Sequence, residues 1–435
     1  MQLRSTVIRV CLAAAILAGG VGAGTLPAAS EALLVIEADS GKVLHADHAT
    51  IPWYPASVTK LMTAYVTLQA VKDRRVSLDS LFTVSLNAVA QQPSKMGFQA
   101  GTQVTLDNAL KMLMVKSAND MAVVLAEGVA GSIENFAGQM NSTASRLGMV
   151  QSHFVNPNGL PEDEQMTSAR DLGILARALI KEFPEYGYYW NIGAIKFGRR
   201  TMRNYNTLIA RYPGADGMKT GFICASGFNL VATATRGNRR LIAVVLGARS
   251  SAVRAVKAAQ LLESGFNSGP LAWLKPSLGT VDALTPINTA PPNMREEMCG
   301  KRRKRPAAET VDEEEEPSAN VDDSQHAMLL NLRPANGKPS QLLQPPSPVL
   351  NPVVVYVGPT KRPEELAVLA ALKPLPAKKK AAKKTAATQA EPAATAAKPA
   401  ATTTAAKPAA ATTTAAAPAK PNPKPKPKPK PPAQQ

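Results

Sequence analysis

Hydrophobic and polar positions alternate with a period of two residues near both ends of the first 270 residues. The segment ALLVIEA, the turn DSGK and the segment VLHADH, together residues 32–48, predict a β-hairpin. The segments MKTGFICAS, GFNLVATAT and LIAVVLGA, between residues 218 and 248, predict three consecutive strands. The predicted sheet therefore draws its strands from both ends of one domain.

Between these strands the apolar positions follow the helical period. A helix is predicted from about Ser57, because Leu61, Ala64, Tyr65 and Leu68 fall on one face. Similar patterns cover residues 106–130, 133–148, 168–183 and 251–264. This order predicts an α+β fold, with a five-stranded antiparallel sheet, flanking helices and a helical insert.

The first 30 residues have the layout of a cleaved secretory signal. Arg4 and Arg9 precede the apolar run Val10–Ala18, and small residues follow it. That run is too short for a comfortable membrane span, which needs about 20 residues. We therefore expect an exported protein whose folded domain occupies residues 31–268.

The composition changes after Gly269. Residues 269–372 are rich in Pro, Asn and Ser and predict a mostly disordered linker, in which SPVLNPVVVYVG could form an isolated strand. Residues 373–435 consist of near repeats of Lys, Ala, Pro and Thr and predict a disordered basic tail. This tail carries +12 of the net charge of +18, so the overall charge says little about the folded part.

The tail could bind anionic envelope polymers or a membrane surface weakly, or it could be a solvated spacer. Export argues against nucleic acid as a partner. The three cysteines do not form a disulfide framework, although Cys224 and Cys299 could pair in an oxidising compartment. The four histidines show no metal-ligand spacing, so neither a metal nor another cofactor is expected.

The segment PASVTK contains a candidate nucleophile. A serine at this point most often caps a helix, and Ser-x-x-Lys arises easily by chance. If the helix begins near Ser57, however, Lys60 lies one turn further on the same face and could act as its base.

Two later segments favour the catalytic interpretation. VKSANDMA contains Ser117 and Asn119, and GMKTGF contains Lys219, Thr220 and Gly221. Taken separately, the first could be a polar break in a helix and the second a surface strand. Their occurrence together, in this order and behind an export signal, is difficult to attribute to chance.

The set SVTK, SAN and KTG resembles the three active-site motifs of the penicillin-binding proteins and serine β-lactamases. The segments FVNPNGL, TSARDL and DGMKTGFICASGFNLVATA resemble those of the low-molecular-weight D-alanyl-D-alanine carboxypeptidases in particular. The resemblance covers residues 33–266. It implies peptidoglycan stem peptides as substrates, β-lactams as covalent inhibitors, and a location in the periplasm or cell envelope.

The resemblance also implies catalytic roles. Ser57 would attack the carbonyl of the penultimate D-alanine, Lys60 would take its proton, and Ser117 would relay a proton to the leaving amine. The backbone amides of Ser57 and Phe222 would form the oxyanion hole.

Substrate-binding roles follow from the same resemblance. Asn119 would hold the substrate backbone or Lys60, and Lys219 would supply positive field. Thr220, within the Lys-Thr-Gly segment that ends at Gly221, would bind the terminal carboxylate. Arg249 matches a position at which some relatives carry an arginine for that carboxylate.

The chain departs from the family pattern in one place, and two related activities stay open. Many relatives read KTGHT or KTGYT where this chain reads KTGFIC, and Cys224 is expected there as a packed thiol.

A β-lactamase would need a deacylating glutamate, but Glu162 and Glu164 do not lie in the usual Glu-x-x-Leu-Asn pattern. A DD-endopeptidase would share all three motifs. A non-catalytic wall-binding protein, with the tail as its active part, is the alternative from another class.

Overall fold

The computed structural model describes residues 31–267, 277–301, 339–345 and 351–373. The predicted signal at residues 1–30 and nearly all of the predicted tail lie outside the described residues. Within the described residues, no helix combines the length and the apolarity that crossing a bilayer requires.

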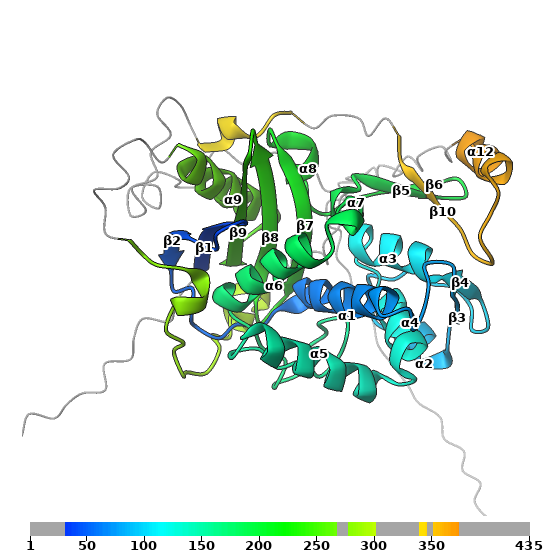
Figure 1. Ribbon diagram of the computed structural model, residues 1–435, viewed down its shortest axis with the longest axis horizontal. Coiled ribbons are helices and arrows are strands. Elements are labelled where there is room, and N and C mark those ends of the chain that lie inside the picture. The colour runs from blue at the N-terminus through cyan, green and yellow to red at the C-terminus, as the bar shows by residue number, and fades with distance from the viewer. Residues whose placement is uncertain (1–30, 268–276, 302–338, 346–350, 374–435) are drawn as a thin grey trace, which may run out of the picture. The chain divides into compact units, whose positions relative to one another are not determined.

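The central element is a five-stranded antiparallel sheet with the strand order β2-β1-β9-β8-β7 (Figure 1). β1 pairs with both β2 and β9, so the N-terminal hairpin joins the C-terminal strands directly. The predicted sheet, drawn from both ends of the domain, is confirmed. Its strands are β1 (Ala32–Glu37), β2 (Val43–Asp47), β7 (Ala215–Ile223), β8 (Gly227–Arg236) and β9 (Arg239–Ala248).

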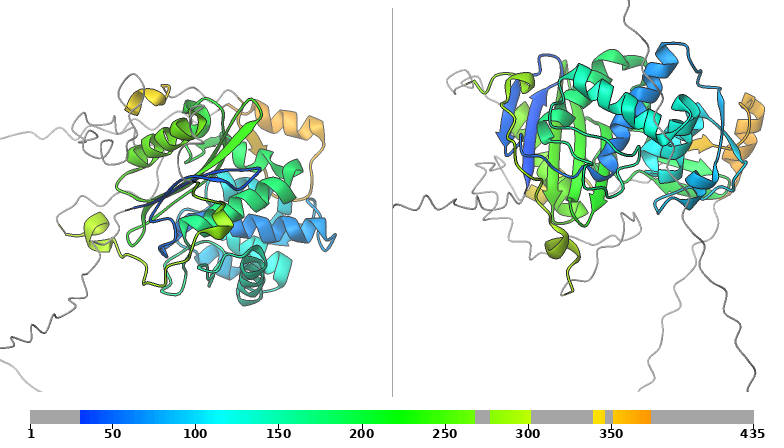
Figure 2. Two further views of the ribbon diagram at one scale, coloured as in Figure 1. Left: turned by 60° about the vertical axis from the view of Figure 1, so that its left-hand side comes forward. Right: turned by 90° about the horizontal axis from the view of Figure 1, so that it is seen from below.

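Helices cover both faces of this sheet (Figure 2). A Cβ placed on Gly173 of α6 (Ala169–Glu182) would meet the Leu34 side chain of β1. A Cβ placed on Gly265 of α9 (Ser251–Phe266) would approach the side chain of Val35. Because successive strand side chains point to opposite faces, α6 and α9 pack on opposite sides of the sheet.

The helical insert packs beside α6 around a buried central helix, α4, which contacts α1, α3 and α5. The sequence pattern predicted one helix over residues 106–130, but the structure divides it at Ser117, whose φ of +57° no α-helix accommodates. The helices of this layer are α1 (Lys60–Lys72), α2 (Leu86–Ala90), α3 (Leu106–Val115), α4 (Asn119–Ala130) and α5 (Ile133–Leu147).

Short elements complete the domain. The strands β3 (Leu81–Thr83) and β4 (Gln103–Thr105) form a two-stranded antiparallel sheet, and β5 (Ala194–Phe197) and β6 (Arg200–Arg203) form a hairpin. Two single-turn helices, α7 (Tyr188–Asn191) and α8 (Leu208–Arg211), pack against β7.

Several segments beyond residue 269 are ordered, although no sequence pattern predicted it for most of them. β10 (Val353–Val355) pairs in parallel with β5, so the strand expected to be isolated joins a small sheet instead. α12 (Pro363–Ala371) follows it, and α10 (Arg295–Cys299) lies earlier in the chain. Val281, Met298 and Val355 of these segments are almost fully buried, so the segments extend the core.

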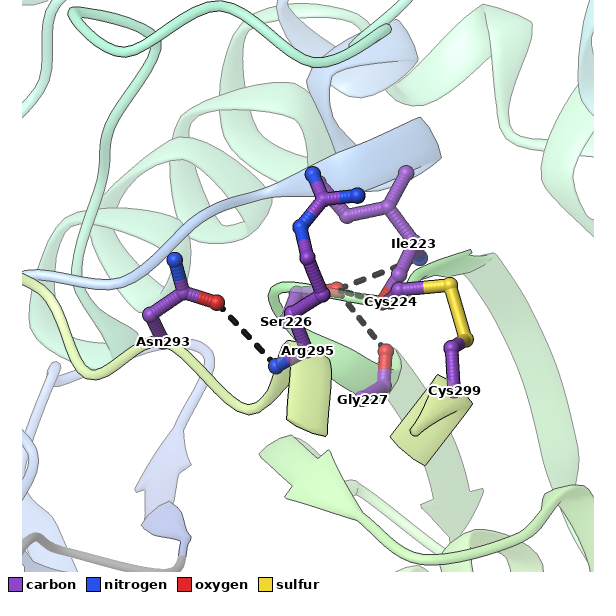
Figure 3. Close-up of a disulfide and its surroundings, with 7 residues drawn as sticks. All are labelled: Ile223, Cys224, Ser226, Gly227, Asn293, Arg295 and Cys299. Atoms are coloured by element: carbon purple, nitrogen blue, oxygen red, sulfur yellow. Dashed lines mark hydrogen bonds between the residues drawn. A yellow bond between two sulfur atoms is a disulfide. The ribbon is translucent and has the colours of Figure 1, made fainter. Parts of the chain in front are cut away.

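A disulfide joins Cys224, directly after β7, to Cys299 at the end of α10 (Figure 3). The expectation that Cys224 is a packed free thiol is therefore wrong. The sequence left this pairing open because its two cysteines lie 75 residues apart, in segments that share no pattern.

Candidate active site

Ser57 lies within a turn of 3-10 helix, Ala56–Thr59, that leads directly into α1. Pro55 directly precedes this turn as its N-cap residue, and no side chain caps either the turn or α1. The Ser57 Oγ instead accepts a hydrogen bond of 2.9 Å from Lys60 Nζ. The helix start positions the hydroxyl of Ser57, but Ser57 is not the cap.

Lys60 is fully buried and holds three oxygens around its Nζ. Besides Ser57 Oγ, they are Asn119 Oδ1 at 2.7 Å and the carbonyl oxygen of Asn158 at 2.6 Å. The two carbonyl-type oxygens can only accept hydrogen bonds, whereas a hydroxyl can also donate. In the neutral amine, Asn119 and Asn158 can accept both hydrogens, which leaves the lone pair for the Ser57 hydroxyl.

The two asparagines that contact Lys60 are themselves fixed. Asn119 Nδ2 donates to the Gln92 carbonyl at 2.8 Å, and the Asn119 backbone amide donates to the Ser94 carbonyl at 2.7 Å. Asn158 Nδ2 donates to Gln91 Oε1 at 2.7 Å. The segment at residues 91–94 thus supports the catalytic contacts of two other segments.

Ser117 lies two residues before Asn119, in the sharp turn between α3 and α4. Its backbone is in the left-handed region that non-glycine residues rarely adopt, and its side chain is almost fully buried. Its Oγ has no hydrogen-bond partner among the described residues. A buried hydroxyl of this kind is costly, so a strained turn with an unpartnered hydroxyl indicates a functional group.

β7 brings Lys219, Thr220 and Gly221 against the turn of Ser57. A Cβ placed on Gly221 would lie 2.6 Å from the Ser57 backbone nitrogen, so only glycine permits this approach. Lys219 and Thr220 are both buried, and Lys219 Nζ donates to the Thr220 carbonyl at 3.1 Å. β7 is an edge strand of the sheet, and it contacts the 3-10 turn that contains Ser57.

Two further residues hold the approach to Ser57, and neither was predicted from sequence. The side-chain amide of Asn229, on β8, donates to the carbonyls of Tyr54 and Pro55 at 2.9 and 3.0 Å. Trp53 Nε1 donates to the Ser226 carbonyl at 3.0 Å. The sheet thus positions the three residues before the catalytic turn.

Arg249 lies apart from Thr220. Ala248 pairs with Phe228, which pairs with Phe222, so Arg249 is level with Ile223 two strands away. Its guanidinium is 2.9 Å from Glu297 Oε1 of α10, and its side chain is 61% exposed. The structure therefore gives this predicted carboxylate ligand a carboxylate partner within the chain.

The structure thus gathers most of the predicted site residues in one place, and Arg249 lies apart from Thr220. The structure brings Ser57, Lys60, Asn119 and the Lys219–Gly221 segment together, and it adds Asn158. Asn158 was missed because its contribution is a backbone carbonyl, although it lies in the quoted segment FVNPNGL. Glu162 and Glu164 are exposed, which is not the setting of a deacylating base.

Residues 22–250 match the family model of the D-alanyl-D-alanine carboxypeptidases. The D-alanyl-D-alanine carboxypeptidase DacC of Escherichia coli is 37% identical over 244 residues, which are 54% of this chain and 61% of that protein. The D-alanyl-D-alanine carboxypeptidase of a Streptomyces species, strain K15, is 30% identical over 61% of this chain and 99% of its own length.

A solved structure is also similar. Penicillin-binding protein 5 of Haemophilus influenzae superposes with a TM-score of 0.52 and 33% identity, over 54% of this chain and 70% of that one. The chain matches less than two thirds of the length of the Escherichia coli relative. Residues 22–250, which match the family model, contain the whole five-stranded sheet and every predicted site residue.

Proposed function

This chain belongs to the D-alanyl-D-alanine carboxypeptidase family, and from that premise we propose that it removes the terminal D-alanine from peptidoglycan stem pentapeptides through a seryl acyl-enzyme. The observation that carries the proposal is the arrangement around Lys60 Nζ, which faces the Ser57 hydroxyl with its remaining partners fixed. A serine hydroxyl is a weak nucleophile until a base of this kind adjoins it.

In the acylation step, Ser57 Oγ forms a bond to the carbonyl carbon of the penultimate D-alanine while its proton passes to Lys60 Nζ. The oxygens of Asn119 and Asn158 keep the lone pair aligned with that proton. Collapse of the tetrahedral intermediate breaks the peptide bond, and the leaving amine receives a proton. Ser117 is proposed as the relay for this proton, which accounts for a buried hydroxyl that has no partner within the part of the chain that the structure describes.

The developing oxyanion is assigned to the backbone amides of Ser57 and Phe222. Gly221 supports this assignment because its missing side chain lets β7, which carries Phe222, lie close to the Ser57 nitrogen. Loss of one such donor typically costs about 3 kcal/mol of transition-state stabilisation. Water then hydrolyses the acyl-enzyme, with Lys60 again as base.

The terminal carboxylate of the substrate is assigned to Thr220, with Lys219 supplying positive charge nearby. These residues precede Phe222 on β7, on the leaving-group side of the reacting carbonyl. Arg249 has less support for this role, because it is level with Ile223 and paired with Glu297.

Covalent inhibition by β-lactams is part of the proposal, because a β-lactam carbonyl would acylate Ser57 in the same way. The proposal also includes export to the cell envelope by residues 1–30. Weak binding of the basic tail, residues 373–435, to anionic envelope polymers or membranes is a separate proposal that rests on its charge. The test compares binding to anionic vesicles with and without the tail. If the tail is needed and binding occurs only at low salt, the binding is nonspecific attraction between charges.

The test measures D-alanine release from a pentapeptide ending in D-Ala-D-Ala, together with covalent penicillin labelling. We expect Ser57→Ala to lose both, whereas Ser142→Ala, a change at an exposed serine, keeps both. Labelling of the wild type without release would favour cleavage of crosslinks, which a crosslinked dimer of stem peptides would reveal. Full activity in Ser57→Ala would contradict the proposed mechanism.

A further inference from the structure

Residues 351–373, the docked segment, lie against α3 and β5, about a hundred residues beyond the end of the match to the family model. Their strand β10 pairs in parallel with β5, with Val355 opposite Phe197 (Figure 1). Val355 is almost fully buried, and Thr360 Oγ1 donates a hydrogen bond to Asp79 Oδ1. The segment is therefore packed onto the domain.

β5 depends on the docked segment for one of its two edges. The small sheet has the strand order β10-β5-β6, so β5 would be an edge strand without β10. Lys196 of β5, which is buried, also donates from its Nζ to the Ala370 carbonyl in α12. Loss of the docked segment would thus leave a row of unpaired backbone groups beside Phe197.

Phe197 connects β5 to a second segment, the support loop of residues 91–98. The ring centroids of Phe197 and Phe98 lie 5.2 Å apart, and the rings are tilted by 58°. Aromatic pairs at this separation attract each other beyond the effect of the apolar area that they bury. Both rings are only half-buried, so their contact depends on β5 staying in place.

The support loop in turn holds the two asparagines that contact Lys60. Two of its backbone carbonyls accept hydrogen bonds from Asn119 at 2.7 and 2.8 Å, and the side chain of Gln91 accepts one from Asn158 at 2.7 Å. Several residues of the loop are exposed, so it has little core of its own. Its geometry therefore depends on contacts such as the one with Phe197.

We propose that the docked segment positions Lys60 for acylation. The path runs from β10 through Phe197 to Phe98. From the support loop it continues through Asn119 and Asn158 to Lys60. The inference rests on the proposed function, because that function makes Lys60 the base. Phe98 and Phe197 are positioning residues, since they act by fixing the oxygens that accept the amine hydrogens of Lys60.

The expected effect is on the rate of acylation rather than on binding. Lys219 and Thr220, which are assigned to the substrate carboxylate, belong to β7 in the other sheet. Loosening of the support loop should therefore slow proton transfer from Ser57 to Lys60. The noncovalent affinity for penicillin should stay unchanged.

The test measures penicillin acylation of the full chain, resolved into a noncovalent dissociation constant and a first-order acylation rate constant. Phe98→Leu and Val355→Asp should each lower the rate constant about three- to tenfold, which is the worth of one aromatic pair, and leave the dissociation constant unchanged. The loss is partial because the amides of Met96 and Gly97 also anchor the support loop to the Asp120 carboxylate.

Two matched controls separate positioning from a general loss of stability. Phe266→Leu removes a half-buried ring from α9, and Val368→Asp places a carboxylate on the exposed side of α12. Both should be acylated at the wild-type rate. In the double variant of Phe98→Leu and Val355→Asp, the rate constant should fall no further than in the slower single variant, because both changes interrupt one path.

Wild-type rate constants in both single variants, or losses that multiply in the double variant, would overturn the path and leave the proposed function intact. A weaker noncovalent affinity with an unchanged rate constant would do the same. Absence of acylation in the wild type would overturn the proposed function itself. If Val355→Asp prevents folding, Phe197→Leu tests the same link from β5 and is expected to match Phe98→Leu.

Discussion

At the scale of single residues, the reactive group is positioned largely by glycines that allow close approach. Because Gly221 has no Cβ, the backbone of Ser57 lies closer to it than it could lie to any other type of residue. Gly159, with a φ of +80°, lies against the turn from another side, where an added Cβ would fall 1.8 Å from the Ala56 carbonyl oxygen. The turn that contains Ser57 is thus packed between two glycines, Gly159 and Gly221.

Gly221→Ala is expected to impair acylation while the domain stays folded. The new methyl group must push β7 and the Ser57 amide apart, and a displacement of about 1 Å at a reacting centre can cost about 10²-fold in rate. The second-order rate of penicillin acylation measures this, with circular dichroism as the check on folding. Gly138→Ala is the control, because a Cβ at Gly138 on α5 meets nothing within 4 Å. If Gly221→Ala is acylated at the wild-type rate, the steric role assigned to Gly221 is wrong.

His45 on β2 should make the folded state sensitive to mild acid. Burial lowers the pKa of its imidazole below the usual 6.5, and the charge of Asp47 opposes this only in part. Its Nε2 is buried with no hydrogen-bond partner among the described residues. The folded state favours the neutral ring, so stability is fully present above pH 6.5 and falls as the pH drops below it.

Urea denaturation between pH 8 and pH 5 measures this effect. The free energy of unfolding of the wild type should fall more steeply below pH 6.5 than that of His45→Gln, which cannot titrate there. His153→Gln is the control at an exposed histidine. Parallel curves for the wild type and His45→Gln would show that burial of His45 does not destabilise its charged form.

The sequence indicated which side chains would gather better than it indicated their supports. Ser57, Lys60 and Asn119 were predicted together because the proposed chemistry restricts which side chains can act at those points, and the structure places them in contact. The Asn158 carbonyl could not be found in this way, because any residue has one. Asn229 was missed for another reason, since a buried asparagine within an apolar strand has no local pattern that reveals its partners.

At the scale of elements, periodicity predicted most helices and all five strands of the main sheet. It joined α3 and α4 into one helix, because the apolar positions continue in phase through Ser117 and only the backbone reveals the break. It gave no sign of α10, which has five residues and is held by the disulfide and by buried Met298 rather than by an amphipathic face.

The disulfide should contribute substantially to stability. Closing a loop of this length restricts the unfolded chain, and such a crosslink typically stabilises by about 2–4 kcal/mol. Reductant should therefore lower the urea midpoint of a protein that begins at residue 31 and so lacks Cys11. The double variant Cys224→Ser and Cys299→Ser should start from the lower midpoint and show no response to reductant. An unchanged midpoint in the wild type would mean that the bond constrains little.

At the scale of the whole molecule, the described fold continues beyond the region that matches the family model. β10 adds a parallel strand to β5, and Val355 at its end is almost fully buried. The Tyr356 amide donates to Asn108 Oδ1 of α3, and the Gly358 amide donates to the Gln103 carbonyl. These contacts are all long-range, which is why no local pattern at residues 351–373 predicted them.

If the β10 segment can detach while the rest of the domain stays folded, the free energy of its docking sets an upper limit on what a change in β10 can cost. Val355→Asp buries a carboxylate without a partner, which would cost several kcal/mol if the segment stayed in place. Detachment is cheaper, so we expect a small change in Tm together with faster amide exchange in β5, which loses its parallel partner. Exchange of a peptide spanning Ala194–Phe197 measures this, and Val368→Asp on the exposed side of α12 is the matched control.

A large fall in Tm with exchange faster throughout the sheet would instead make β10 part of the cooperative unit that carries Ser57. Truncation within residues 351–373 would then inactivate the enzyme, although the family match ends a hundred residues earlier.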